Sequence, residues 1–535
     1  MEQNSRIKSA RYFSADFKPS KKMERLEFTT AKNGEKTCKI GSVFLHSSYN
    51  PSAEAKRFVS SINCDFSPCF ILIAEPCLSY CVPFLRQRFP ESHIIAIRYN
   101  SAFSEYNSLF DGTAAILDKG SVYEFENTIL SLTGEDGLCS SLFLSWKAAC
   151  SIFQEQDALA WQSIKRIALK SRALLFTKER FSKRWLKNSI HFVKGAQKIV
   201  TIKKTTMPIV VVASGPSLQT ALPYLKKLRE TYFLLCVSSA TSVLLHNHIT
   251  PDVVISTDGG YWANEHLFPL LKNSDVPLAI SAESACPKNI LQKNPIIPLF
   301  YNDGFENEIA MIWKEETGGQ VSQAARNGTV SGTAVEYALS LTSGVVFACG
   351  LDLSPSKEYQ HTQPNALEKN AACIDYKIKN LESRQIQSMI NSEESLEIYK
   401  GWFSENARRF EKRFFRLADN FPYKNSLGTI RDVDFSFFET NVIHSKKMNT
   451  TFEMTTIDSE DRKNALKKVK NFIIKSSKTE RWQKYVFPCD FLLYEKRIEK
   501  SEKQSLYTAI LKKNNDFVKK LTALCEDFDE TDSTF

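Results

Sequence analysis

The chain has 535 residues, among them 70 Lys and Arg and 60 Asp and Glu, which gives a formal net charge of +10. This length suits two or three domains, and because both charge signs are intermixed, the positive excess is typical of a solvated surface and predicts no nucleic-acid partner. No apolar stretch reaches the ~18 residues of a transmembrane helix and the polar N-terminus lacks a signal-peptide apolar region, so we expect a cytoplasmic protein without a membrane span.

The first part of the chain divides into a polar start and an α/β domain. Residues 1–36 are polar and rich in Lys and Ser, so we expect poor order there. Residues 37–175 are expected to form an N-terminal α/β domain, whose clearest strand, residues 69–74, leads into Glu75 and Pro76. A glutamate would repel a phosphate at this turn, and a proline has no N–H to donate. We therefore interpret the turn as structural.

The 13 cysteines are scattered through apolar stretches, which is typical of reduced core thiols and not of a disulfide framework. Cys77 and Cys81 have i, i+4 spacing, but no second pair of ligands lies near them in the sequence. A zinc site is therefore not expected. The sequence predicts no metal and no bound cofactor.

Residues 176–205 are basic and contain aromatic side chains, and we interpret them as a connector. In residues 206–369, which we expect to form the central domain, apolar runs alternate with helical patterns, and this predicts a mainly parallel sheet. Ligands of such sheets bind beyond the carboxyl ends of the strands. Small and polar residues stand at those ends here, so a binding site is expected along that edge.

The turn after the first strand of the central domain is the most informative motif. In residues 208–218 an apolar run ends in a glycine turn, and leucines then recur at helical spacing. Backbone N–H groups and the positive end of the helix dipole meet at such a turn and attract an anion. Strand–turn–helix units also occur without a ligand, so phosphate binding and a purely structural turn both stay open. The residues of the expected cradle are Ser214, Gly215, Pro216 and Ser217.

Other polar residues follow later strands of this domain. Ser238 and Ser239 end one strand and are further candidates for ligand binding. Asp258 ends the next strand, where it would hold a ribose or an acceptor or simply close a turn. Asp352, at another strand end, would orient a ligand hydroxyl or cap its loop. A second helix N-terminus facing the same crevice is expected at Ser331, Gly332 and Thr333.

Several of these motifs resemble the motility-associated-factor flagellin glycosyltransferases. The matching stretches of the central domain are residues 213–218, residues 249–252 with Asp258, and residues 350–352 with His361 downstream. Residues 44–55 resemble that family's N-terminal domain, and residues 180–188 resemble its interdomain segment. The first turn and residues 331–332 with 350–352 are also similar to bacterial sialyltransferases that use CMP-activated nonulosonic acids. The resemblance covers roughly residues 40 to 430 and is most specific in the central domain.

This resemblance implies an α/β fold with an N-terminal α/β domain, a central Rossmann-like, sialyltransferase-like domain with a mainly parallel sheet, and a mostly helical C-terminal region. That last region, residues 370–535, is charged and helical in pattern, which suits solvated helices or an acceptor-binding surface. The implied activity is transfer of a nonulosonic acid from a CMP-activated donor to serine or threonine hydroxyls of flagellin, in support of flagellar assembly and motility.

Such a transfer passes through an oxocarbenium-like state, with a phosphate departing and a hydroxyl attacking. The resemblance places a candidate general base at His361, and an imidazole with an ordinary pKa near 6.5 accepts a proton at neutral pH. The sialyltransferases have their base histidine farther downstream, where this chain has none before His444. Tyr359 would stabilise the departing phosphate or pack as a lid. The candidate catalytic residues are His361, Asp352, Tyr359 and Asp258.

Two other functions stay open. The central turn and the Pro-Asp…Asp pattern also resemble archaeal-type hydroxymethylpterin diphosphokinases, in which acidic side chains such as Asp258 and Asp352 would hold magnesium. The other alternative is a non-catalytic flagellin-binding module, because a fold alone does not settle function.

Overall fold

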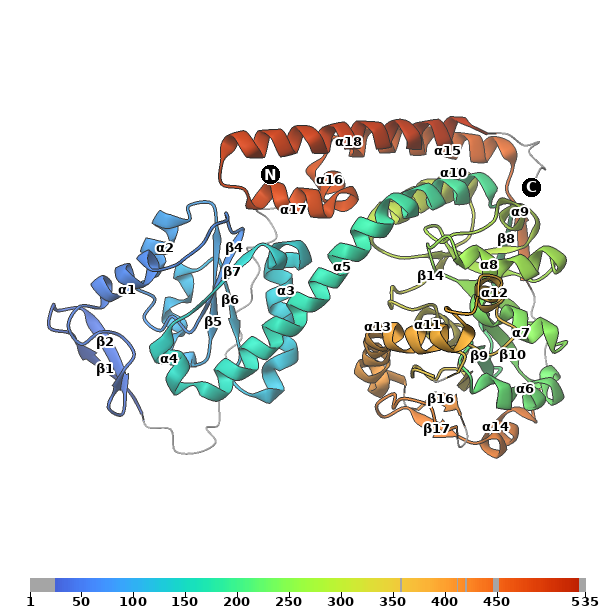
Figure 1. The fold of residues 1–535 in the computed structure, drawn as a ribbon, viewed down its shortest axis with the longest axis horizontal. Helices are drawn as coiled ribbons and strands as arrows, with labels where there is room; N and C mark the ends of the chain where they lie inside the picture. Colours follow the sequence, from blue (N-terminus) through green and yellow to red (C-terminus); the bar gives the residue numbers. More distant parts are fainter. Residues whose placement is uncertain (1–24, 357, 411, 419–420, 446–451, 529–535) are drawn as a thin grey trace. The chain divides into compact units, whose positions relative to one another are not determined.

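Figure 1 shows the computed structural model, which describes residues 25–356, 358–410, 412–418, 421–445 and 452–528. The chain forms two compact units. Unit 1 comprises Met1–Arg180 with Lys478–Asp516, and unit 2 comprises Phe181–Ser477 with Phe517–Phe535. Two long helices, α5 (Gln154–Gly195) and α18 (Lys500–Glu526), contain residues of both units.

Unit 1 is built around a parallel four-stranded sheet with the strand order β6-β5-β4-β7. These strands are β4 (Phe70–Ala74), β5 (His93–Arg98), β6 (Gly112–Ala115) and β7 (Ser141–Ser145). The helices that belong to this unit alone are α1 (Pro51–Ser60), α2 (Val82–Arg88), α3 (Val122–Cys139), α4 (Lys147–Ile152), α16 (Glu480–Val486) and α17 (Pro488–Lys496). Four residues of β4 are fully buried, since helices and the neighbouring strands cover its β-branched run. The α/β class expected for the N-terminal domain is confirmed.

The start of unit 1 differs from the expectation of poor order up to residue 36. Residues 25–36 are described, and an antiparallel sheet is formed by β1 (Leu26–Thr30), β2 (Lys36–Ile40) and β3 (Val43–Phe44). The polar composition of this segment resembles that of a disordered tail, although Thr37, Cys38 and Ile40 of β2 are buried. The remainder of the expected tail, residues 1–24, lies outside the described residues.

The turn at Glu75 is closed by its own side chain. The buried Glu75 carboxylate accepts the N–H groups of Tyr99 at 2.6 Å and Asn100 at 3.1 Å, and it pairs with the Arg98 guanidinium at 3.0 Å. Burial raises the pKa of Glu75, and the Arg98 charge opposes that shift. This carboxylate occupies the place of an anion, in agreement with a structural role for the turn.

Unit 2 contains an eleven-stranded sheet with the order β17-β16-β15-β9-β10-β11-β12-β13-β8-β18, in which β14 also pairs with β13. Within the described residues its pairings are parallel, except that β18 is antiparallel to β8. The strands are β8 (Lys198–Ile202), β9 (Ile209–Val212), β10 (Phe233–Val237), β11 (Val253–Ser256), β12 (Leu278–Ser281), β13 (Ile296–Phe300), β14 (Ser322–Gln323), β15 (Val346–Cys349), β16 (Phe414–Leu417), β17 (Arg431–Val433) and β18 (Phe452–Thr456). This confirms the mainly parallel Rossmann-like sheet.

Among the described residues, ten helices belong to unit 2 alone. They are α6 (Leu218–Lys227), α7 (Thr241–His246), α8 (Ala263–Leu267), α9 (Lys288–Lys293), α10 (Gly304–Thr317), α11 (Val330–Leu341), α12 (Ala366–Ala372), α13 (Leu381–Phe410), α14 (Phe435–Val442) and α15 (Ser459–Ser476). Among the described helices, none combines the length and the apolar character that crossing a bilayer requires.

The strand order places a topological switch point between β9 and β15. From β9 the chain builds outward through β10, β11, β12 and β13, and it then returns to lay β15 on the other side of β9. Connections therefore leave β9 and β15 in opposite directions, which opens a crevice beyond the carboxyl ends of these two strands. The predicted residues 214–217 and Asp352 directly follow these strands.

The sheet extends beyond the range expected for the central domain. In the expected connector, α5 continues to Gly195 and β8 then joins the sheet edge. The C-terminal region is mostly helical as expected, but its strands β16, β17 and β18 also belong to this sheet. These strands have only three to five residues and lie in charged sequence, so no apolar run marks them.

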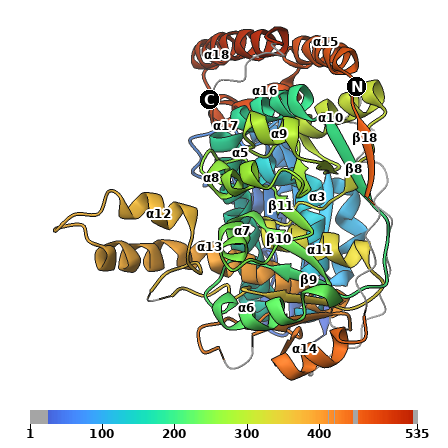
Figure 2. The same ribbon diagram turned by 90° about the vertical axis from the view of Figure 1, so that its right-hand side faces the viewer.

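Figure 2 shows α12 and the first part of α13 projecting from the body of unit 2. The turn between them exposes Ile374 by 71% and Ile378 by 86%, and Ile386 and Ile390 on α13 are also at least half exposed. We refer to residues 366–400 as the arm. Exposed apolar side chains are common on surfaces that contact another molecule.

Candidate functional site

The centre of the switch crevice is the turn between β9 and α6. The Gly215 N–H donates to the Gly350 carbonyl oxygen at 2.8 Å, and the Ser217 N–H donates to Asp352 Oδ2 at 2.8 Å. The Leu218 N–H donates to the Gly215 carbonyl oxygen at 3.0 Å. We expected the N–H groups of this turn to bind a phosphate. Each of the three instead donates to an acceptor within the chain.

Asp352 acts as an internal anion of this turn. Its side chain is buried, with the residue 2% exposed, and it also accepts the hydroxyl of Ser217. Ser217 stands at the N-cap position of α6, but its hydroxyl bonds to Asp352 and does not cap the helix. Burial raises the pKa of Asp352, and the hydrogen bonds from Ser217 oppose that shift. A phosphate at this turn would have to replace the carboxylate on these donors, and phosphate binding here stays a prediction.

The segment that follows the Asp352 loop lies across the turn. The Thr362 N–H donates to the Ser214 carbonyl oxygen at 2.7 Å, and its hydroxyl donates to the Gly215 carbonyl oxygen at 2.7 Å. The hydroxyls of Ser214 and Ser239 are 2.8 Å apart, which joins the ends of β9 and β10. Ser238 is buried beside Ser239, and Pro216 is partly exposed. The structure thus brings most of the predicted binding residues together at one edge.

His361, next to Thr362, belongs to a cluster of titratable side chains. Burial lowers the pKa of His361 below its ordinary value of 6.5. Burial and the nearby His361 lower the pKa of His266, on α8, to about 4, against the opposing charge of Asp258. Burial raises the pKa of Tyr399, on α13, and the charge of Asp258 adds to this shift. His266 therefore lies near both His361 and Asp258, and Tyr399 lies near Asp258. Both imidazoles are neutral at pH 7, because their pKa values are lowered.

The loops that carry these groups are tied to one another. Asn365, the N-cap of α12, donates from its side chain to the Ser239 carbonyl oxygen at 3.4 Å. Asn370 on α12 donates to Glu265 on α8 at 3.0 Å. These bonds hold the His361 segment against the helix that carries His266.

Sequence reasoning missed His266 and Tyr399. His266 lies within a five-residue helix of otherwise ordinary composition, and Tyr399 lies at the far end of the arm from His361 in the sequence. The available signal was the position of His266 a short distance after Asp258, at the carboxyl edge of the expected sheet. Tyr359 is partly buried in the same loop as His361.

The second predicted helix N-terminus, at residues 331–333, belongs to α11, which begins at Val330. Thr329 is its N-cap, and the Thr329 hydroxyl oxygen accepts the Gly332 N–H at 2.7 Å. Ser331 and Gly332 are in the first turn, whose leading N–H groups have no intrahelical acceptors. Thr333 is buried and donates to the Ala325 carbonyl oxygen at 3.3 Å, so it fixes the turn and does not face a ligand.

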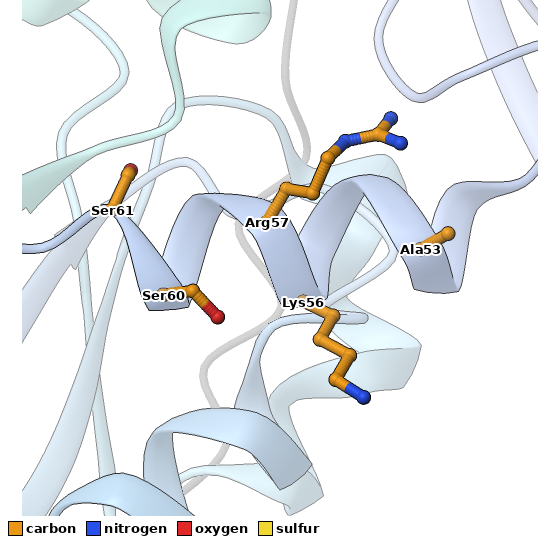
Figure 3. Close-up of a pocket in the computed structure, with 5 residues that line it drawn as sticks. All are labelled: Ala53, Lys56, Arg57, Ser60 and Ser61. Carbon is orange, nitrogen blue, oxygen red and sulfur yellow. The ribbon is translucent and has the colours of Figure 1, made fainter.

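A hollow lies elsewhere, on α1 of unit 1 (Figure 3). It measures about 550 Å³, and its lining residues are Ala53, Lys56, Arg57, Ser60 and Ser61. Figure 3 shows Lys56 and Arg57 extending away from the helix and from each other. None of the predicted site residues lines it. Over the part of the chain that the structure describes, no three His, Cys, Asp or Glu side chains gather as metal ligands.

Residues 183–358 match the family model described as "6-hydroxymethylpterin diphosphokinase MptE-like". Two proteins of Treponema pallidum (strain Nichols), each described as an uncharacterized protein, are 29% identical over 56% of this chain and 28% identical over 30% of it. The matches cover 65% and 27% of the lengths of those relatives.

A solved structure matches the whole chain. It is the MAf glycosyltransferase from Magnetospirillum magneticum AMB-1, with a TM-score of 0.58 over 100% of this chain and 95% of that chain. This protein has the fold of a MAf glycosyltransferase. The sequence identity is 11%, so the likeness establishes the shared fold and not the roles of single residues. The resemblance inferred from the motifs is thereby confirmed for the MAf fold, which here contains an MptE-like segment.

Proposed function

We propose that this protein is a glycosyltransferase that acts at the switch crevice of unit 2. The observation that carries this proposal is that His266 lies near both His361 and Asp258, and that the His361 segment is bonded to the turn after β9, in a chain with the MAf fold. Imidazoles that are neutral at pH 7 beside a hydroxyl-lined crevice suit proton transfer from an alcohol acceptor.

The proposed donor is a CMP-activated nonulosonic acid. Support for it comes from the motif resemblance to sialyltransferases and from the polar edge formed by the hydroxyls of Ser214 and Ser239 and by the first turn of α11. The leading N–H groups of α11 and its dipole favour the negative charge of a phosphate. In this proposal, Asp352 holds the neighbouring turn in place for the donor.

The proposed transfer needs one proton acceptor. The acceptor oxygen forms a bond to the anomeric carbon while the bond from that carbon to the CMP oxygen breaks, and CMP leaves with the bonding electrons. His361 takes the proton of the acceptor hydroxyl, since its lowered pKa keeps the imidazole unprotonated at neutral pH. Tyr359 and Asp258 are the groups proposed to help orient the phosphate and the acceptor.

The proposed acceptor is flagellin, on its serine and threonine hydroxyls. The motif resemblance supports this choice, and the arm offers exposed isoleucines between His361 at one base and Tyr399 at the other. A polypeptide docked on the arm would therefore reach the titratable cluster. The test is intact mass spectrometry of flagellin incubated with this protein and a CMP-nonulosonic acid, compared with flagellin from a strain that lacks the protein. Unmodified flagellin in both samples would exclude this acceptor.

A second candidate is a diphosphokinase that moves diphosphate from magnesium-ATP to a hydroxymethylpterin. The match of residues 183–358 to the MptE-like family favours it. In that reaction Asp258 and Asp352 would be the metal ligands. Both oxygens of Asp352 accept hydrogen bonds from Ser217 in this structure, so the turn would have to open first.

Ligand-dependent thermal shifts separate these candidates. Stabilisation by CMP or CTP, with transfer that survives EDTA, supports the glycosyltransferase, whereas stabilisation by magnesium-ATP with a pterin supports the diphosphokinase. Binding of flagellin without either nucleotide effect would support a non-catalytic flagellin-binding module.

A further inference from the structure

Arg326 lies at the carboxyl edge of the unit 2 sheet, between β14 and α11. Its guanidinium donates to both oxygens of Glu283, at 2.6 and 2.8 Å, and to the carboxylate of Asp303 at 3.2 Å. Glu283 follows β12 and Asp303 follows β13. One side chain therefore joins the ends of three neighbouring strands by charged hydrogen bonds.

Two aromatic rings contact the same guanidinium. The ring centroid of Tyr301 is 4.6 Å from the guanidinium carbon, and that of Trp185, on α5, is 5.5 Å away. The Tyr301 hydroxyl also interacts with the side chains of Thr257 and Ser281. Since Thr257 directly precedes Asp258, these contacts extend from Arg326 to the loop after β11.

Trp185 and Asn188, both on α5, also contact the loop that contains Asp258. A Cβ placed on Gly259 would lie 2.4 Å from the Trp185 indole, so only glycine lets this backbone approach the ring. The Asn188 amide donates to the carbonyl oxygens of Glu283 at 2.7 Å and Gly259 at 3.3 Å. The Asp258 carbonyl oxygen in turn accepts the Ala285 N–H at 2.9 Å.

Arg326 also fixes the start of α11. It stands three residues before the N-cap Thr329, and Thr333 in the first turn bonds back to the Ala325 carbonyl oxygen at 3.3 Å. The N-terminus of α11 and the Asp258 loop therefore share one anchor. They are the two elements that the proposed function uses for phosphate and for the acceptor.

A lysine cannot reproduce this anchor. The planar guanidinium forms a two-pronged pair with Glu283 and stacks between rings, whereas an ammonium is a single compact charge. The Glu283 side chain is only 5% exposed, and burial raises its pKa while the Arg326 charge opposes that shift. The planar geometry of the Arg326 guanidinium, and not only its charge, therefore holds the loops that contain Glu283 and Asp303.

We propose that Arg326 is a positioning residue that holds the Asp258 loop and the α11 N-terminus in one fixed arrangement. Its importance for catalysis rests on the proposed function, but the coupling of the two elements does not.

Arg229 provides a matched control on the opposite edge of the same sheet. It pairs with Asp252 at 2.8 Å, donates to the Thr250 carbonyl oxygen at 2.7 Å and lies 5.6 Å from the Tyr232 ring centroid. Asp252 Oδ2 accepts the Leu234 N–H at the amino end of β10. An Arg229→Lys variant therefore loses a similar set of guanidinium contacts, at the amino end of the strands and away from the crevice.

The experiment is amide hydrogen exchange of the full chain as wild type, Arg326→Lys and Arg229→Lys. Arg326→Lys is expected to speed exchange about tenfold at Ala285, Gly332 and Thr333 and to leave Leu234 unchanged. Arg229→Lys is expected to speed exchange at Leu234 and to leave exchange at Ala285, Gly332 and Thr333 unchanged. Equal loss of protection in both variants, or unchanged exchange at Ala285 and Gly332 in Arg326→Lys, would overturn the proposal. If Arg326→Lys does not fold, Asp303→Asn is the milder variant, because Asp303 is 61% exposed.

CMP affinity is measured on the same proteins. If wild type binds CMP, Arg326→Lys is expected to weaken binding at least tenfold while Arg229→Lys leaves it unchanged, a difference that a general loss of stability would not produce. Equal CMP affinity in the two variants would overturn the positioning of a donor site by Arg326. If wild type does not bind CMP, the proposed donor is wrong, and the exchange rates still decide whether Arg326 couples the two elements.

Discussion

The Asp352 carboxylate accepts both the backbone N–H and the hydroxyl of Ser217, two residues that are 135 positions apart in the sequence. This contact closes the β9–α6 turn onto the β15 loop with a charge supplied by the chain itself. Unit 1 has a related contact, in which the buried Glu75 carboxylate after β4 accepts the N–H groups of Tyr99 and Asn100 after β5. In both units a buried carboxylate therefore joins the ends of two neighbouring parallel strands.

Replacing Ser217 by alanine is expected to lower the free energy of unfolding by about 1–3 kcal/mol, because the buried Asp352 carboxylate loses a hydroxyl donor. Urea denaturation of both proteins measures the change. Ser340→Ala is the control, since its exposed hydroxyl donates to the Tyr337 carbonyl oxygen of its own helix. Equal stability of wild type and Ser217→Ala would show that the turn does not depend on this bond.

Replacing Gly215 by alanine is expected to destabilise the fold by more than about 2 kcal/mol. An added Cβ would lie 2.5 Å from the Gly350 carbonyl oxygen and 2.6 Å from Asp352 Oδ2, where backbone cannot move aside. Gly401→Ala is the matched control, since nothing lies within 4 Å of its Cβ position on α13, and a slight gain in stability is expected. A Gly215→Ala protein as stable as wild type would contradict the close approach of these two loops.

Acidification is expected to destabilise unit 2 through His266. Its folded pKa of about 4 lies below the ordinary 6.5, so its contribution is fully present above pH 6.5 and is lost as the pH falls toward 4. The shift corresponds to at most about 3 kcal/mol. His361 has a shift of the same sign, so it acts in the same direction.

Urea denaturation at pH 7 and pH 4.5 tests this dependence on His266. The difference in stability between the two pH values should shrink in His266→Gln and persist in His246→Gln, whose histidine is exposed. An unchanged difference in His266→Gln would remove His266 as the source.

Replacing His361 by alanine is expected to slow sugar transfer by about a hundredfold to ten-thousandfold, because a general base is lost. The nucleotide affinity should change little, since His361 is proposed to act on the acceptor. Transfer rates to flagellin and CMP binding, measured on the same protein, check both statements. A variant with the wild-type transfer rate would leave Tyr359 or Asp258 to handle the proton.

Much of the fold follows from local sequence. The apolar runs in β9, β10, β11 and β15 are buried on both faces, and this pattern predicts central parallel strands. The strand β16 escaped prediction because Arg416 lies within it, a buried arginine that pairs with Asp432 of β17. Only the tertiary structure explains a buried charge in a strand.

The candidate site was predictable only in part. Residues at strand ends, such as Ser214 and Ser239, meet because parallel strands end at the same edge, and a sequence pattern expresses this. The inward direction of Asp352 depends on the chain crossing back beside β9, which no local pattern contains. His266 was missed for the same reason, because its neighbour His361 belongs to a distant loop.

The antiparallel pairing of β18 with β8 has a consequence for synthesis on the ribosome. β8 lies near residue 200, but its outer partner is made only after residue 452 has been added. Until then, β8 presents an unpaired edge that invites pairing with other chains. Unit 1 is likewise complete only once residues 478–516 have emerged. Nascent chains of this protein therefore have a long interval in which chaperone protection of the sheet edge would raise the yield of folded molecules.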